Sequence, residues 1–135
     1  MPLPFHNGVW VPHVLVPFFW DNCLYGPNPC LFMDYMQFTF DNQEWIYSAK
    51  NMTPNQIIQR WTTQVAEKFS LNQTELSDLF DRKNPHNAYY RTVYMYKYNV
   101  QKNAAGTPQG RVNGIVIENY PETTDQWFDI LNTVY

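Results

Sequence analysis

The spacing of apolar residues predicts helices over the middle of the chain. In residues 30–40 the apolar positions recur at helical spacing on one wide face, and they are Leu31, Phe32, Tyr35, Met36, Phe38 and Phe40. Residues 41–43 are polar and interrupt this pattern, while residues 44–47 predict a short continuation. The pattern therefore indicates a helix near residues 30–40 followed by a shorter one.

Helix-start signals precede three further apolar repeats. Thr53 to Gln56 form a capping box with Pro54 at the first helical position, and the apolar repeat that follows is Ile58, Trp61, Val65 and Phe69. A second box at residues 72–75 opens a short helix with Leu76, Leu79 and Phe80. A third helix is predicted to begin at Asn84-Pro85 and to end near residue 99, with a stripe of Tyr89, Val93 and Tyr96.

The C-terminal part of the sequence predicts a hairpin and a closing helix. Asn113-Gly114 suits a type I′ turn, because both central residues of that turn need a positive φ. Residues 106–108, Gly-Thr-Pro, predict a sharp turn before the first strand, with a cis bond before the proline. The last helix is predicted to open at residues 123–127, and the strand residues expected to pack on it are Ile115 and Ile117.

These C-terminal motifs resemble those of the DsbA-like family of thioredoxin-fold proteins. In that family a Gly-Thr-Pro turn, a strand, an Asn-Gly turn, a second strand and a closing helix follow one another, as they do over residues 106–127. Residues 2–6 are similar to the end of the family's central strand. Phe40 to Gln43 is similar to the Phe-x-Asn-Gln signature of the family's helical insertion. The resemblance, made of short motifs, covers nearly the whole chain.

The resemblance implies one α/β domain over residues 1–135, with a truncated thioredoxin-like fold that consists mostly of the helical insertion. Residues 1–7 would be a residual strand, and residues 8–100 would be the insertion. Residues 101–135 would hold the Gly-Thr-Pro turn, the β-hairpin and the terminal helix.

The first helix of the implied insertion departs from the family pattern. It would span residues 8–20, where Pro12 and Pro17 each remove an amide donor and clash with the preceding turn, at about 3 kcal/mol each. We therefore expect a broken or short helix there. His6 precedes this segment at a position where the family often has a histidine, and we expect its ring to bond to the local backbone.

In the DsbA-like family a Cys-x-x-Cys pair at the head of a helix carries out thiol-disulfide exchange. That helix lies before the segment that residues 1–6 resemble, and we expect this chain to start after it. The resemblance therefore implies a degenerate domain without catalytic exchange. Thr107 and Pro108 match the family's cis-proline motif, which implies that their backbone binds an extended peptide. Gln109 to Arg111 replace the bulky apolar residues that usually follow this motif.

Cys23 and Cys30 are the two cysteines of the chain, and three interpretations of them stay open. A disulfide would close a loop of eight residues and restrict the unfolded chain by about 2–3 kcal/mol. The two thiols could instead be free and buried, or Cys30 could be a weak redox nucleophile, because Pro29 places it at a predicted helix start. The cysteines and the two N-terminal histidines, His6 and His13, lack the short ligand spacing of zinc sites, so we expect no metal and no cofactor.

Composition and charge exclude several classes of protein. The 135 residues are 44% hydrophobic and 18% aromatic, which supplies a core, and a net charge of −3 without a basic run argues against nucleic-acid and membrane partners. We expect the tyrosine-rich run at residues 89–98 to lie in the core and at its rim, because base-stacking surfaces are formed on sheets or grooves with basic neighbours. No stretch reaches the roughly 18 apolar residues that span a bilayer, and no signal peptide is recognisable, so the default expectation is the cytoplasm. Two sequons, at Asn51 and Asn72, would fit a secretory-pathway form of a longer parent chain.

The sequence thus favours a non-catalytic DsbA-like domain that binds a peptide or a partner protein. Two alternatives stay open: a thiol-disulfide oxidoreductase that acts through Cys30 or through missing N-terminal sequence, and a helical protein-interaction module without thiol function. If the central strand is reduced to Leu3-Pro4-Phe5, the edge from Gln109 to Val112 lacks a full partner strand. We expect that edge to bind an extended peptide, to pair with a separate N-terminal fragment, or to form a weak homodimer.

Overall fold

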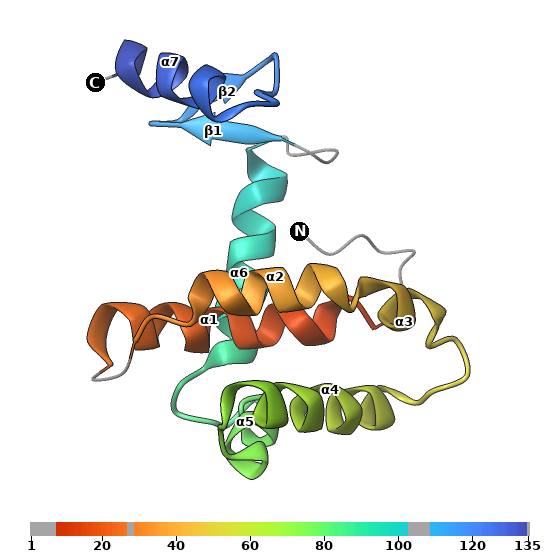
Figure 1. Ribbon diagram of the computed structural model, residues 1–135. Helices are drawn as coiled ribbons and strands as arrows, with labels where there is room; N and C mark the ends of the chain where they lie inside the picture. Colours follow the sequence, from red (N-terminus) through yellow and green to blue (C-terminus); the bar gives the residue numbers. More distant parts are fainter. Residues whose placement is uncertain (1–7, 27–28, 103–108, 135) are drawn as a thin grey trace. The chain divides into compact units, whose positions relative to one another are not determined.

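The computed structural model describes residues 8–26, 29–102 and 109–134 (Figure 1). Its elements follow in the order α1 (Trp10–Tyr25), α2 (Phe32–Asp41), α3 (Gln43–Ser48), α4 (Pro54–Phe69), α5 (Gln73–Asp78), α6 (Ala88–Gln101), β1 (Gly110–Val112), β2 (Ile115–Ile117) and α7 (Thr124–Val134). The chain divides into two compact units, Met1–Tyr98 and Asn99–Tyr135, and the last residues of α6 belong to the second.

The described residues are mostly helical, with a two-stranded antiparallel hairpin near the C-terminus. This result confirms the coarse prediction of helices first, then a hairpin, then a closing helix. The expected residual strand at residues 1–7, with His6 in it, lies outside the described residues, and so does the Gly-Thr-Pro turn at residues 106–108.

The core of the first unit forms where α1 packs against both α2 and α4 (Figure 1). Tyr35 of α2 and Trp61 of α4 are fully buried at its centre, and the Tyr35 ring stacks on Phe19 of α1 at 4.1 Å between centroids. The Tyr35 hydroxyl donates to the Pro12 carbonyl at 2.5 Å and accepts from Trp61 Nε1 at 3.2 Å. One hydroxyl therefore satisfies polar groups on two other helices inside an apolar core.

Helix α1 runs from Trp10 to Tyr25 without a break, so the expectation of a broken or short helix over residues 8–20 is wrong. Pro12 lies in the first turn, where an amide donor is not needed. Pro17 cannot donate to the carbonyl of His13, but the Thr92 hydroxyl of α6 donates to that carbonyl at 3.1 Å. A side chain from another helix thus replaces the hydrogen bond that the proline removes.

The helix starts agree with the sequence signals where those signals are local. Thr53 Oγ1 accepts from the amide of Gln56 at 3.3 Å, and the Gln56 side chain accepts from the amide of Thr53 at 2.8 Å, which confirms the predicted capping box. Asn72 caps α5 with its side-chain oxygen. Helix α6 begins at Ala88 rather than at the predicted Asn84-Pro85, because Asn87 has a φ of 55° and interrupts the helical path.

In the second unit β1 and β2 pair as Gly110 with Ile117, Arg111 with Val116, and Val112 with Ile115. The connecting residues have positive φ angles, 50° at Asn113 and 84° at Gly114, which confirms the predicted Asn-Gly turn.

Helix α7 covers one face of the hairpin. A Cβ placed on Gly110 would lie 3.6 Å from the Trp127 ring, and Trp127 in turn meets Tyr120 edge to face at 5.5 Å between centroids. Ile117 is half-buried on the same face, whereas Ile115 is 63% exposed and does not pack as expected.

Candidate functional site

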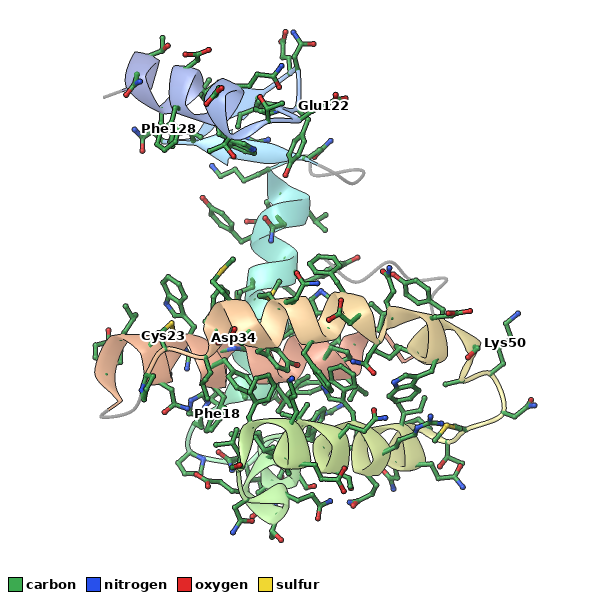
Figure 2. The ribbon with its side chains drawn as sticks, in the orientation of Figure 1. Phe18, Cys23, Asp34, Lys50, Glu122 and Phe128 are labelled. Carbon is green, nitrogen blue, oxygen red and sulfur yellow. A yellow bond between two sulfur atoms is a disulfide. The ribbon has the colours of Figure 1, made fainter. Side chains whose placement is uncertain are left out.

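The two cysteines form a disulfide. Cys23 lies in the last turns of α1 (labelled in Figure 2), and Cys30 lies in the connection to α2, with their Cα atoms 4.3 Å apart. Cys30 is exposed, whereas Cys23 is half-buried. Because α2 begins only at Phe32, Cys30 does not stand at the head of a helix in the way that lowers the pKa of a catalytic thiol. The bond joins the end of α1 to the connection that precedes α2, and its Cys30 side is exposed.

The end of α1 beside this disulfide is apolar and exposed. Trp20, Leu24 and Tyr25 are all exposed, and the Trp20 ring meets Phe32 of α2 edge to face at 5.2 Å between centroids. Exposed apolar side chains gathered at one end of a helix are typical of protein-binding surfaces.

The hairpin offers a second candidate site, along β1. In a hairpin closed by a two-residue turn, the residues that flank the turn exchange hydrogen bonds and the next pair does not. Val112 and Ile115 are the flanking pair, so the N–H and C=O of Arg111 face away from β2. Among the described residues β1 has no strand neighbour except β2, and this outer edge is therefore a template for another strand.

The Arg111 side chain holds the start of the hairpin to the end of α6. Its guanidinium donates to the carbonyl of Lys102 and lies 3.5 Å from the carbonyl of Gly114. The predicted peptide-binding residues Thr107 and Pro108 fall between these anchors in the sequence, but they lie outside the described residues. The structure therefore positions the strand that follows the predicted motif and says nothing of the motif itself.

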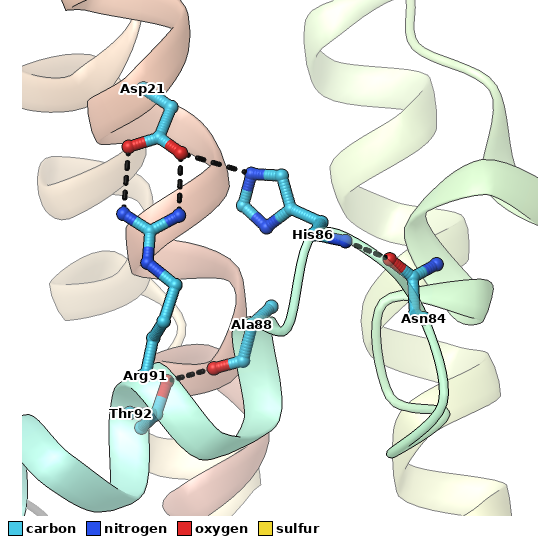
Figure 3. A network of polar contacts seen from close by, with 6 residues as sticks. All are labelled: Asp21, Asn84, His86, Ala88, Arg91 and Thr92. Carbon is cyan, nitrogen blue, oxygen red and sulfur yellow. Dashed lines mark hydrogen bonds and ion pairs between the residues drawn. The ribbon is translucent and has the colours of Figure 1, made fainter.

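A cluster of charged groups joins α1 to α6 and to the turn that precedes α6 (Figure 3). The Arg91 guanidinium donates to both oxygens of the Asp21 carboxylate, at 2.5 and 2.7 Å, and His86 Nε2 lies 3.2 Å from the same carboxylate. The amide of His86 donates to Asn84 Oδ1 at 2.9 Å, which fixes the turn that carries the ring. Sequence analysis did not find this cluster, because Asp21 and Arg91 are 70 positions apart and neither belongs to a motif.

The electrostatics of this cluster favour a structural role. The hydrogen bond from Arg91 lowers the pKa of Asp21, so the carboxylate stays ionised and its oxygens are occupied by donors. Burial lowers the pKa of His86, which keeps its ring neutral near pH 7. An ionised carboxylate held by an arginine in a bidentate pair is a weak general base, and the cluster is suited to fastening α1 to α6.

Neither a metal centre nor a membrane span is found in the part of the chain that the structure describes. No group of three or more His, Cys, Asp or Glu side chains comes together there, and none of the helices there combines the length and apolar character needed to cross a bilayer. His13 Nδ1 lies 2.8 Å from the carbonyl of Val9 on its own helix, and both cysteines are in the disulfide. His6 lies outside the described residues.

Comparison of the chain with protein-family models, with curated proteins and with solved structures found no match. The function therefore has to be argued from the disulfide loop and from the outer edge of β1.

Proposed function

We propose that this protein is a degenerate DsbA-like, thioredoxin-like domain that binds an extended peptide or protein segment along the outer edge of β1 and does not itself exchange thiols. The observation that carries the proposal is the backbone of Arg111, whose N–H and C=O face away from β2 on a strand without a second neighbour among the described residues. The order of elements, helices followed by a hairpin and a closing helix, also supports it.

Strand addition is the binding mode that this edge favours. A peptide strand laid beside β1 accepts from the Arg111 amide and donates to the Arg111 carbonyl, each bond contributing about 0.5–1.5 kcal/mol. Thr107 and Pro108, which the family resemblance implies as peptide-binding residues, come just before β1 in the sequence and lie outside the described residues. Polar Gln109 and Arg111 limit indiscriminate pairing, so the expected interaction is weak and specific.

The test compares two substitutions of Arg111 that both remove its guanidinium contact with the Lys102 carbonyl and differ in the outward amide. Arg111→Pro removes the outward amide but leaves the bonds between Val112 and Ile115, whereas Arg111→Ala removes the charge and keeps the amide. The probe is a reduced, carboxymethylated polypeptide, which is extended and has no thiols. We expect Arg111→Pro to weaken binding about tenfold, which corresponds to about 1.4 kcal/mol, and Arg111→Ala to change it less than about threefold.

Two results would contradict the peptide-binding proposal. One is unchanged binding by Arg111→Pro with the hairpin shown by NMR to be intact. The other is a concentration-independent monomer in which the Arg111 amide is strongly protected from hydrogen exchange, since that edge would then be covered within the chain. Self-association that Arg111→Pro abolishes would identify a second copy of the chain as the strand that binds.

The proposed lack of thiol exchange is supported by the cysteine geometry. Cys23 and Cys30 are bonded across a loop rather than arranged as Cys-x-x-Cys at a helix start. We expect the purified protein neither to reduce insulin nor to oxidise a reduced peptide above a control without protein. Robust insulin reduction or peptide oxidation that disappears in Cys30→Ser would contradict this part of the proposal.

Two other functions each have an observation in their favour. The exposure of Cys30 within a disulfide favours a thiol-disulfide oxidoreductase acting through that residue, and the insulin assay tests it. The exposed Trp20, Leu24 and Tyr25 favour a helical interaction module. If the module binds the probe through this surface, Leu24→Asp will weaken binding and Arg111→Pro will not.

A further inference from the structure

One of the two sequons of the chain, at Asn51, lies in the connection between α3 and α4, and the other starts at Asn72, the residue that caps α5. Asn72-Gln73-Thr74 follows α4, and its asparagine is exposed. Asn72 Oδ1 accepts from the amides of Thr74 and Glu75, at 2.9 and 3.2 Å. Both bonds use the oxygen, so a substituent on Nδ2 leaves them in place. A sugar on Asn72 is therefore compatible with the folded chain and with the start of α5.

The Cys23–Cys30 disulfide gives an independent reason to place the chain in an oxidising compartment. Disulfides persist mainly in secreted proteins and in the lumen of the secretory pathway, where asparagine-linked glycans are also attached. From the exposed sequon together with the disulfide we infer that Asn72 is an N-glycosylation site. This inference is independent of peptide binding at β1.

The transfer needs one co-reactant, an oligosaccharide linked to a lipid through pyrophosphate. The Asn72 amide nitrogen, Nδ2, attacks the anomeric carbon of the first sugar and a new N–C bond forms. The C–O bond to the lipid pyrophosphate breaks, and the pyrophosphate leaves with the bonding electron pair. The amide loses one proton to a base of the transferase, and no group is oxidised or reduced.

Asn51 is the natural comparison within the same chain. It is exposed, and Asn51-Met52-Thr53 has the same spacing, but Pro54 follows the threonine. Proline removes the amide after Thr53 and restricts the Thr53 backbone, which narrows the conformations that a transferase can bind. We therefore assign the glycan to Asn72 and not to Asn51.

The test expresses the full chain behind a cleavable secretion signal in eukaryotic cells and measures intact mass before and after peptide:N-glycosidase F. We expect one glycan on the wild type. It should be lost in Asn72→Gln and in Thr74→Ala, and kept in Thr74→Ser and in the matched control Asn51→Gln. Alkylation with and without reduction, on the same samples, reports whether the disulfide has formed.

Several results would overturn the assignment. A secreted, disulfide-bonded wild type without a glycan would show that the sequon is not used. A glycan that persists in Asn72→Gln, or that disappears in Asn51→Gln, would place the modification elsewhere. Free thiols in the secreted protein would show that the disulfide does not form there. The disulfide would then no longer support an oxidising compartment, which counts against the inference.

Discussion

Replacing Thr92 by valine tests how a proline is accommodated inside α1. Pro17 has no N–H to donate to the carbonyl of His13, and the Thr92 hydroxyl donates to it instead at 3.1 Å. The single proton of this hydroxyl is shared with the carbonyl of Ala88 in α6, which lies 2.9 Å away (Figure 3). Valine keeps the shape of threonine and loses the hydroxyl, so the change removes these hydrogen bonds without creating a cavity.

The expected cost follows from the group that is left without a donor. A buried carbonyl with no partner costs about 1–3 kcal/mol, and because the His13 carbonyl is only partly buried we expect about 1–2 kcal/mol for Thr92→Val. The control is Thr63→Val in α4, where the hydroxyl donates to the carbonyl of Gln59 in its own helix at 2.9 Å. That change should alter the free energy of unfolding by less than about 0.5 kcal/mol.

A double-mutant cycle with Pro17→Ala isolates the mechanism. Alanine at position 17 restores an amide that can donate to His13, so Thr92→Val should cost at least about 1 kcal/mol less in that background. Urea unfolding followed by far-ultraviolet circular dichroism gives the four free energies. If Thr92→Val lowers the free energy of unfolding equally with proline and with alanine at position 17, Thr92 does not compensate for the missing amide of Pro17, and the reasoning fails.

Further predictions concern the core, the charged cluster and the disulfide. Tyr35→Phe should destabilise the protein by about 1–3 kcal/mol in urea unfolding, because it leaves the indole N–H of Trp61 without an acceptor; an unchanged midpoint would contradict this. The hydrogen bond from Arg91 lowers the pKa of Asp21 in the folded protein. The ionised carboxylate therefore stabilises the folded protein fully above the pKa of the unfolded chain, about 3.9, and this stabilisation is lost as the pH falls through the lower pKa of the folded protein. Asp21→Asn should therefore be less stable than wild type at neutral pH, with the difference closing in acid; a difference independent of pH would argue against the ion pair. Removing the disulfide by Cys23→Ser with Cys30→Ser should lower the free energy of unfolding by about 2.5 kcal/mol, the loop entropy of eight residues, and reduced wild type should match the variant.

The features that sequence could predict are those with local causes. The capping box at Thr53 and Gln56 needs only four consecutive residues, and the Asn113-Gly114 turn needs only two residues that accept a positive φ. Both occur as the pattern indicated. The order of the later elements followed from the same signals, because each helix or strand carried its own start or turn.

The features that sequence missed depend on distant residues. Helix α1 continues through Pro17 because Thr92, far along the chain, supplies a donor. The cluster of Asp21, His86 and Arg91 forms only when α1 meets α6 and the turn before it. The late start of α6 depends on the left-handed conformation of Asn87. The Asn84-Pro85 pair is itself a helix-start signal, so the sequence predicted the start too early. Periodicity carries no information about which side chains meet across such distances.

The hydrogen bond from Thr92 to His13 also sets an order of events during synthesis. Helix α1 leaves the ribosome long before residue 92 has been added, so the nascent helix has a carbonyl that only water can satisfy in the meantime. Water at that carbonyl competes with the tight packing of α1 on its neighbours. Helix α1 therefore completes its hydrogen bonding only when α6 docks. In a chain released before residue 92, the His13 carbonyl would remain bonded to water and α1 would be only partly packed.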